Sequence, residues 1–315
     1  MKTEKRKSKI GGQALIEGVM MRGLDKVSMA VRLPNKKIDI ETWQVGSLVH
    51  PKWYRKIPIL RGVVGMVSSL ALGYKCLMKS AEKAAMGEEE QSEPQNKEEQ
   101  AKNEGLTKNI IKIAGIVGTI LAVILSIGLF MFIPSLAIKT LNSAVGLNDF
   151  SKAILEGILK IIIFVAYLTI ISLMPDMRRT FQYHGAEHKT ISCYEADCEL
   201  TVENVKKFTR FHPRCGTSFL IIVMIISILI FSLITWDDLL VRVLLKFALL
   251  PVITGCSFEI IQLAGRYTNT CTRIVSAPGL WLQRLTTSEP DESQIEVAIA
   301  AFEQVIPENK DEDQW

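Results

Sequence analysis

The sequence predicts an α-helical membrane protein with about four transmembrane helices and a small α+β cytoplasmic portion that includes an N-terminal β-hairpin. Three observations support this fold class. The 315 residues are 48% hydrophobic and 22% charged, a mixture that fits neither an ordinary soluble enzyme nor a pure bundle of membrane helices. Several apolar runs reach the length of a membrane span, and basic residues lie between them. The net charge of +4 is too small to indicate nucleic-acid binding, so we expect no nucleic-acid partner.

Four apolar segments are the expected spans, because a helix of about 20 apolar residues crosses a hydrocarbon core about 30 Å thick. Two of them carry no charge. In another, Glu156 and Lys160 are one helical turn apart and able to pair. The last contains Pro251, a residue that can break a helix, so the sequence leaves open whether this span is straight or broken there. The alternative, long buried helices of a soluble protein, is disfavoured by the length of the uncharged runs. The four segments are residues 113–138, 153–174, 219–236 and 239–263.

The distribution of Lys and Arg predicts the orientation of the spans. Basic residues concentrate on the cytoplasmic side of a membrane. Here they cluster before the first span and between the second and third spans, whereas the other two connections are short. We therefore expect a multi-pass protein of the cell membrane, with the lipid bilayer as its partner and with both termini and the central loop in the cytoplasm. A homo-oligomer is compatible with the sequence but is not defined by it.

The region before the first span is expected to be mostly cytoplasmic. Residues 1–86 contain an alternating stretch, Ser28–Thr42, that predicts the β-hairpin. The apolar stretch Ile57–Leu77 includes Arg61 and several glycines. We expect it to form an interfacial or re-entrant helix, with amphipathic packing against the domain as the alternative. Residues 87–109 are acidic and have no apolar face, which predicts a disordered linker.

The C-terminal segment is predicted to be cytoplasmic as well. Glu289–Ile306 has the periodicity of an amphipathic helix, and the acidic tail after Pro307 is expected to be frayed. Trp281 is expected to anchor this segment at the membrane interface. The remaining predicted units are a first transmembrane hairpin (110–174), a cytoplasmic loop with His and Cys (175–218), a second transmembrane hairpin (219–265) and the C-terminal segment itself (266–315).

Candidate metal ligands are concentrated in the central loop. His184 and His188 are four residues apart, with Glu187 between them, so a helix would project both imidazoles from one face. The pattern H-x-x-E-H is the inverted form of the zinc-protease helix, in which the Glu acts as general base. His212 and Cys215 follow in the same loop and add another imidazole and a thiol. The alternative is a cluster of hydrogen-bonded interfacial histidines beside a buried cysteine.

The residue that completes the ligand set is left open by the sequence. His212 or Cys215 could join the histidine pair. Glu259 is the third candidate, because an ionisable residue inside an apolar segment is costly and is a functional candidate by default. Its alternative role is a salt bridge with one of three arginines, namely Arg266, Arg178 or Arg179.

A glycine-rich stretch near the N-terminus, GGQALIEGVMMRG, is the other unusual feature. We expect a loop with backbone freedom that brings Glu17 and Arg22 to the site. The alternative is a tight glycine turn with a structural Glu–Arg pair.

Four stretches of the chain resemble the bacterial YqhQ family: GGQALIEGVMMRG, FQYHGAEHKTI, FHPRCGTSF and APGLWLQRLTTSEPD. The resemblance covers nearly the whole chain apart from the acidic linker and tail. Members are uncharacterised membrane proteins described as predicted metal-dependent enzymes, a label that rests on the same histidines. The resemblance implies, as motif positions, Glu17, His184, Glu187, His188, His212 and Cys215.

Together these features lead us to expect a metal-dependent membrane enzyme, a hydrolase that acts on a membrane-proximal substrate at the cytoplasmic face. One divalent metal, which we expect to be zinc, would be bound by His184, His188 and one of the three further candidates. Glu187 would be the general base, and Arg22 or Arg214 would stabilise an anionic intermediate. The rival functions are a non-enzymatic scaffold and a transporter, with a structural metal or with none.

Overall fold

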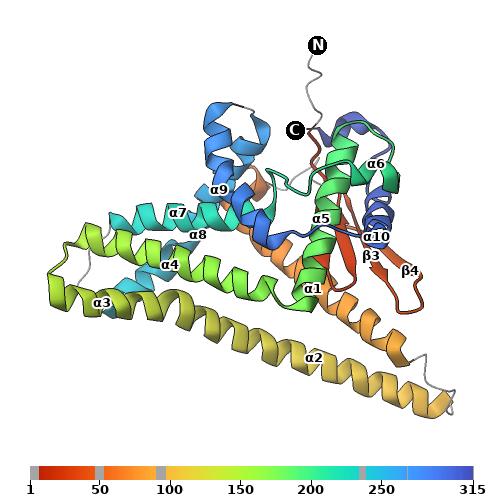
Figure 1. The fold of residues 1–315 in the computed structure, drawn as a ribbon, viewed down its shortest axis with the longest axis horizontal. Helices are drawn as coiled ribbons and strands as arrows, with labels where there is room; N and C mark the ends of the chain where they lie inside the picture. Colours follow the sequence, from red (N-terminus) through yellow and green to blue (C-terminus); the bar gives the residue numbers. More distant parts are fainter. Residues whose placement is uncertain (1–6, 47–52, 90–96, 234–238, 268, 315) are drawn as a thin grey trace.

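The computed structural model describes residues 7–46, 53–89, 97–233, 239–267 and 269–314. Figure 1 shows a group of long helices and, at one end of it, a small sheet flanked by helices. The long helices are α1 (Leu60–Glu89), α2 (Lys97–Ile127), α4 (Asp149–Ser172), α5 (Pro175–Glu195) and α8 (Leu239–Arg266). The shorter ones are α3 (Ile133–Val145), α6 (Val202–Lys206), α7 (Gly216–Ser232), α9 (Thr270–Thr286) and α10 (Glu292–Glu303), and a π-helical turn, Gly128–Phe132, joins α2 to α3.

The sheet has four antiparallel strands in the order β1-β2-β3-β4. The predicted hairpin is confirmed as β3 and β4, paired with Met29 opposite Glu41. The glycine-rich stretch expected as a loop is instead a second hairpin, β1 and β2, whose turn residue Glu17 has a φ of 52°. Gly18 serves close strand packing, because a Cβ there would lie 3.1 Å from the Cα of Val31. The strands are β1 (Gly11–Leu15), β2 (Gly18–Arg22), β3 (Lys26–Arg32) and β4 (Ile38–Gln44).

Both faces of the sheet are covered, because strand residues alternate between two apolar cores. On one face, Val19 and Met21 pack with α5 and α10 through Tyr183 and Phe302. On the other face, residues such as Met20 pack against α1. The α1 residues in that second core are Leu72, Cys76 and Leu77. The amphipathic packing considered for Ile57–Leu77 is therefore present along the second half of that stretch.

The acidic segment expected as a disordered linker over 87–109 is helical at both ends. Helix α1 continues to Glu89 and α2 already begins at Lys97, while residues 90–96 lie outside the described part. The reason is composition, because Glu, Lys, Gln and Ala are all good helix formers even without an apolar face.

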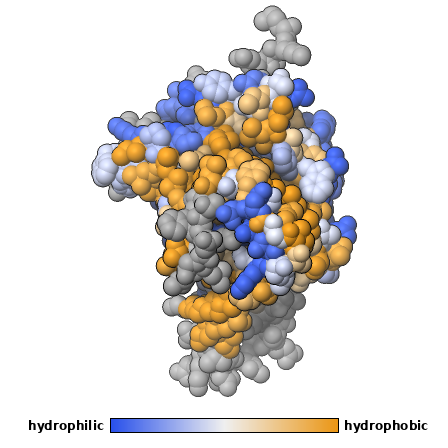
Figure 2. Space-filling model, turned by 90° about the vertical axis from the view of Figure 1, so that its left-hand side faces the viewer, coloured by the Kyte–Doolittle hydropathy of each residue, from blue (hydrophilic) through white to orange (hydrophobic). Residues whose placement is uncertain are grey.

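Three helical stretches are long and apolar enough to cross a membrane: Ile113–Val145, Asp149–Ser172 and Leu244–Ala264. A fourth apolar helix, Gly216–Ser232, is shorter, and the end of the span expected there (234–236) lies outside the described residues. Helix α8 continues through Pro251 without a break. Viewed from the α3 end, hydrophobic side chains cover much of the surface, interrupted by a compact hydrophilic group (Figure 2).

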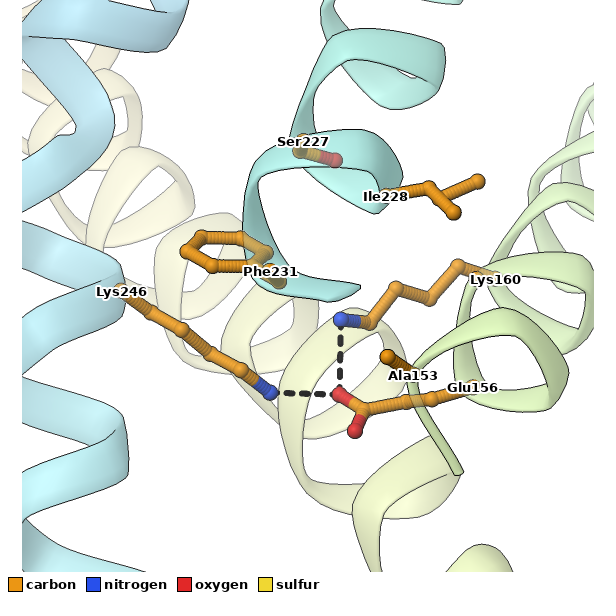
Figure 3. A pocket seen from close by; sticks show the side chains of 8 residues that line it. Ala153, Glu156, Lys160, Ser227, Ile228, Phe231 and Lys246 are labelled. Carbon is orange, nitrogen blue, oxygen red and sulfur yellow. Dashed lines mark hydrogen bonds and ion pairs between the residues drawn. The ribbon is translucent and has the colours of Figure 1, made fainter. Parts of the chain in front are cut away.

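A charged cluster joins α4 to α8 (Figure 3) and includes Ser135 of α3. Oε1 of Glu156 accepts hydrogen bonds from Lys160 at 2.8 Å, from Ser135 of α3 at 3.2 Å and from Lys246 of α8. The predicted Glu156–Lys160 pair is confirmed, and Lys246 is an additional partner. The groups border a cavity of about 20 Å³, also lined by Phe231 of α7, which is room for about one water molecule.

The C-terminal region is ordered around α10. The predicted amphipathic helix is confirmed, with Ile295, Ala298 and Phe302 buried on its inner face. The tail, expected to be frayed, instead ends in a 3-10 turn in which Asp313 is fully buried. Its Oδ2 accepts hydrogen bonds from Ser8 Oγ at 2.9 Å and Tyr194 Oη at 3.0 Å, so buried polar contacts hold the tail.

Candidate metal centre

Helix α5 carries the histidine pair, and its fold explains why a glycine interrupts the motif. Gly185 is buried against the chain between α9 and α10, where a Cβ would collide with the carbonyl oxygen of Ser288. Relative to alanine, a glycine inside a helix lowers helix stability by about 1 kcal/mol, and the packing of α5 in the core offsets this loss. The pair therefore lies on one face of a regular helix, as predicted.

The structure brings three metal-ligand side chains together: His184, His188 and Cys215. One ligand atom from each lies within 4.8 Å of the other two. His184 Nε2 is 3.2 Å from Cys215 Sγ, and the two imidazole rings are 4.4 Å apart between centroids. Neighbouring ligands of a tetrahedral zinc ion are separated by about 3.3–3.7 Å, given bond lengths of about 2.0 Å to nitrogen and 2.3 Å to sulfur. The cluster is thus close to the geometry of a three-ligand zinc site.

Both histidines are oriented by the backbone. Nδ1 of His184 lies 2.8 Å from the carbonyl oxygen of Thr286, at the end of α9, and Nδ1 of His188 lies 2.6 Å from that of Arg210. A carbonyl oxygen only accepts, so Nδ1 carries a proton in each ring and Nε2 is the nitrogen that would face a metal. Metal-binding histidines almost always have such an outer hydrogen bond.

Cys215 is the N-cap of α7, and its Sγ also contacts the hydroxyl of Thr217 at 3.2 Å. Burial would raise the pKa of Cys215, but the adjacent His188 and His184 outweigh burial and hold it well below its usual value. Burial would likewise lower the pKa of His184, but the charge of the Cys215 thiolate raises it to about 9. A thiolate beside imidazole nitrogens is the donor set that zinc prefers.

Glu187 lies beside the cluster with an unsatisfied oxygen. Its side chain is buried, and within the described residues its Oε2 accepts no hydrogen bond. Gly12, in β1, lies against the carboxylate, because a Cβ there would be 3.0 Å from Cδ of Glu187. Burial raises the pKa of Glu187, against the opposing effect of the two histidines. An orphaned buried carboxylate oxygen is costly and indicates a ligand, water or ion that completes the site.

His212 is held in a different network and is not a member of the three-residue group. Its Nε2 lies 3.5 Å from Glu195 Oε2. Its backbone N–H donates to Oε1 of Gln283 at 2.8 Å, and its carbonyl oxygen accepts from Nε2 of Gln283 at 2.7 Å. Arg214 pairs with Glu195, so its charge is already matched there. Of the expected third ligands, the structure places Cys215 with the histidine pair and His212 behind His188, with ring centroids 5.6 Å apart.

Glu259 lies outside the three-residue group, in an ion pair between α8 and α1. Arg61 donates to both of its carboxylate oxygens, with Nε 2.7 Å from Oε1. The salt bridge considered as its alternative role is therefore present, but with Arg61 and not with the three arginines considered from the sequence. Gly62 and Gly255 allow this close helix contact, because a Cβ at Gly62 would lie 3.1 Å from the Cα of Gly255.

Glu17 and Arg22, the charged residues of the first hairpin, lie at its turn and at the end of β2. Glu17 pairs with Arg179 and accepts a hydrogen bond from Tyr183 at 3.3 Å, one helical turn before the site. Arg22 is half-buried at the end of β2, opposite Gly11. The sequence missed Thr286, Arg210 and Glu195, because two of them act through backbone carbonyls and the third pairs with Arg214, 19 residues away at no helical or strand spacing.

The fold and the site define a class: a mainly helical protein with apolar helices and an adjoining sheet domain that supports a His/His/Cys cluster. The family model described as "Protein of unknown function (DUF1385)" matches residues 57–308. The "Uncharacterized protein YqhQ" of Bacillus subtilis (strain 168) is 36% identical over 299 residues, which cover 94% of this chain and 92% of the relative. The chain therefore belongs to the DUF1385 (YqhQ) family, and the resemblance seen in the sequence is confirmed. No solved structure matches the chain significantly.

Proposed function

We propose that this protein is a metal-dependent hydrolase that is embedded in the cell membrane and acts at its cytoplasmic face. The observation that carries the proposal is the placement of Glu187 Oε2, buried and unsatisfied, beside the His184–His188–Cys215 cluster. Three protein ligands and an adjacent carboxylate are the arrangement of catalytic zinc sites, which keep one coordination position open. Structural zinc sites, in contrast, are closed by four protein ligands.

The donor set fits a divalent metal, with zinc as the preferred ion. His184 and His188 would bind through Nε2, because Nδ1 of each ring is hydrogen-bonded to a carbonyl, and Cys215 would bind as the thiolate. A bound zinc ion supplies a Lewis acid that polarises the scissile group and lowers the pKa of water. The half-buried ring of His184 marks the side from which a substrate would approach, since His188, Glu187 and Cys215 are buried.

In this proposal Glu187 moves the proton. Its free oxygen accepts a proton from the attacking water as the new bond to the carbonyl or phosphoryl centre forms, and returns that proton to the leaving group when the scissile bond breaks. The backbone of Gly12 packs against the carboxylate and restricts its orientation. The N-terminal end of the α7 dipole, next to Cys215, would stabilise developing negative charge.

The membrane part of the proposal is supported by composition and by exposure. Large apolar residues such as Ile124, Leu125 and Ile170 are more than 60% exposed on the candidate spans, which suits a lipid environment and not water. The central loop and both chain ends would then lie in the cytoplasm, because they carry most of the basic residues near the spans.

The test is metal content and turnover of the detergent-purified full chain. The double variant His184→Ala/His188→Ala should lose a stoichiometric metal, whereas His50→Ala, a matched control that removes the one histidine outside the described residues, should retain it. Glu187→Gln should keep the metal and lose hydrolytic turnover. Wild-type protein that is purified without chelator and contains no stoichiometric metal would overturn the proposal.

A structural metal is the second candidate, and the burial of the cluster favours it. The same Oε2 of Glu187 could then be the fourth ligand, which would close the site. Glu187→Gln separates the two roles, because loss of metal from this variant identifies a ligand and retention of metal with loss of turnover identifies a base.

A further inference from the structure

Helix α9 has two unlike faces. Its inner face is buried, and includes Ser276, Gly279 and Leu282. On the outer face Ile274 is 68% exposed and Trp281 is 51% exposed. Residues three, four and seven apart share a helix face, so the exposed positions form one continuous strip. This outer strip of α9 consists of Arg273, Ile274, Ala277, Trp281 and Arg284.

The outer strip combines apolar area with positive charge. Helix α9 contains no Asp or Glu, and within the described parts of the chain neither Arg273 nor Arg284 forms an ion pair. Two large exposed apolar side chains next to unpaired arginines make this face amphipathic. Trp is enriched at membrane interfaces, and arginines with Trp or Leu on an amphipathic helix bind anionic lipid surfaces.

The position of α9 in the fold places this strip at the end of the apolar helices. It follows α8 closely and packs against α7, α8 and α4. Gly279 meets Ser218, in the first turn of α7, where no side chain at position 279 would fit. In Figure 1, α9 turns steeply against α7 and α4 and does not run alongside them. Such a helix lies where the apolar part ends and the sheet domain begins.

We propose that the outer strip of α9 lies in the headgroup layer of the bilayer, with Ile274 and Trp281 at the acyl boundary and Arg273 and Arg284 bound to the phosphates of anionic phospholipids. This inference rests on the membrane embedding that the proposed function includes. The partner is the lipid surface, because the strip offers both the apolar area and the positive charge that an anionic headgroup layer complements.

The same helix connects the lipid surface to the metal centre. The carbonyl of Thr286, which orients His184, is five residues beyond Trp281, or about 8 Å along a helix axis. The headgroup layer on each side of a bilayer is about 5–7 Å thick. A hydrolase site held there fits a substrate that stays anchored in the membrane and presents its scissile bond near the headgroups.

The depth of Trp281 is the test. The full chain with Trp281 as its only tryptophan is reconstituted in nanodiscs of phosphatidylcholine with or without phosphatidylglycerol. Lipids with a nitroxide near the headgroup should quench its fluorescence about twofold more than lipids with a nitroxide at the chain end. Spin-labelled phosphatidylglycerol should quench more than spin-labelled phosphatidylcholine, and Arg273→Gln/Arg284→Gln should abolish that difference. The control Lys36→Gln/Lys37→Gln, which removes two charges from the β3–β4 turn, should keep it.

The outcomes separate this inference from the proposed function. Protein that does not remain with the nanodisc on gel filtration overturns the membrane embedding and, with it, this inference. Protein that remains embedded but is not quenched by either nitroxide has α9 in water, which overturns only the inference. Stronger quenching from the chain end overturns it as well, because α9 would then lie deep in the membrane.

Discussion

Gly12 of β1 lies directly against the Glu187 carboxylate, so the first strand of the sheet forms one wall of the candidate metal centre. A side chain does not fit at this position, because a Cβ would lie 2.7 Å from the carbonyl oxygen of Met20 and 3.0 Å from Cδ of Glu187. The glycine-rich stretch thus reaches the site through its backbone, while Glu17 pairs elsewhere on α5.

Gly12→Ala should therefore disturb both the sheet and Glu187. We expect a loss of about 1–3 kcal/mol in the free energy of unfolding, which is typical of overpacking, together with weaker metal retention. Gly11→Ala is the matched control, because a Cβ at Gly11 has no heavy atom within 4 Å. Thermal unfolding in detergent and metal content measure the two effects. Equal melting and equal metal content in the two variants would contradict the assignment of Gly12 to the wall of the site.

Metal should protect Cys215 from alkylation. After treatment with chelator, the thiolate that the two histidines stabilise becomes available, and iodoacetamide should modify Cys215 faster than in the metal-loaded protein. Cys198 and Cys271 are exposed and serve as internal references whose modification should not depend on metal. Peptide mass spectrometry gives the rates, and an unchanged rate for Cys215 would argue against metal ligation by this thiol.

Glu156 should be essential for the packing of the apolar helices. Glu156→Leu leaves the ammonium groups of Lys160 and Lys246 without the carboxylate that binds both, and we expect destabilisation of about 3–5 kcal/mol. Ser135→Ala, which removes only the hydroxyl contact, should cost about 1 kcal/mol. The melting temperatures of both variants in detergent check this order. A similar small shift for the two variants would show that the charge cluster contributes little.

The contact between α1 and the sheet should weaken in acid. Glu41 binds Lys79 and Lys83, and the hydrogen bond from Lys79 lowers the pKa of Glu41 below its ordinary value of 4.5. A carboxyl group with a lowered pKa stabilises the folded state above its unfolded pKa and loses this contribution as the pH falls through the folded value. The contact is partly exposed, so we expect less than about 1 kcal/mol at neutral pH.

The check is the pH dependence of unfolding, compared between wild type and Glu41→Gln. The wild type should be slightly more stable at pH 7, and the difference should vanish below pH 4.5, where the carboxyl group becomes protonated. Trp43 reports the contact, because Lys79 lies 5.7 Å from the centroid of its ring. A difference that persists unchanged at low pH would mean that the effect of the variant is not electrostatic.

Local patterns predicted the parts of the fold that depend on neighbouring residues. The alternation around Pro34 predicted the β3–β4 hairpin, and the 3.6-residue period predicted α10. The spacing of His184 and His188 predicted their common helix face. The glycines of the β1–β2 hairpin were misleading, because glycine signals flexibility in sequence but serves close backbone packing here.

Features that depend on distant partners could not be predicted. Glu259 and Arg61 are 198 residues apart, and no local pattern links them. The carbonyls of Thr286 and Arg210 orient the histidines through backbone atoms, which every residue possesses and which side-chain patterns therefore do not reveal. The buried Asp313 was expected in a frayed tail, because acidic composition indicates disorder and its partners Ser8 and Tyr194 lie far away in the chain.

The pairing of the two chain ends limits how the chain can cross a bilayer. Ser8 and Gln314 form an antiparallel bridge, and the N–H of Lys9 donates to the carbonyl of Asp313 at 2.6 Å. Ends that touch must lie on the same side of any membrane, so the number of crossings is even. An odd number of crossings, such as three, is therefore excluded. If all three candidate spans cross the membrane, a further segment must cross it as well, and the shorter apolar helix Gly216–Ser232 is the candidate for that crossing. The three candidate spans are Ile113–Val145, Asp149–Ser172 and Leu244–Ala264.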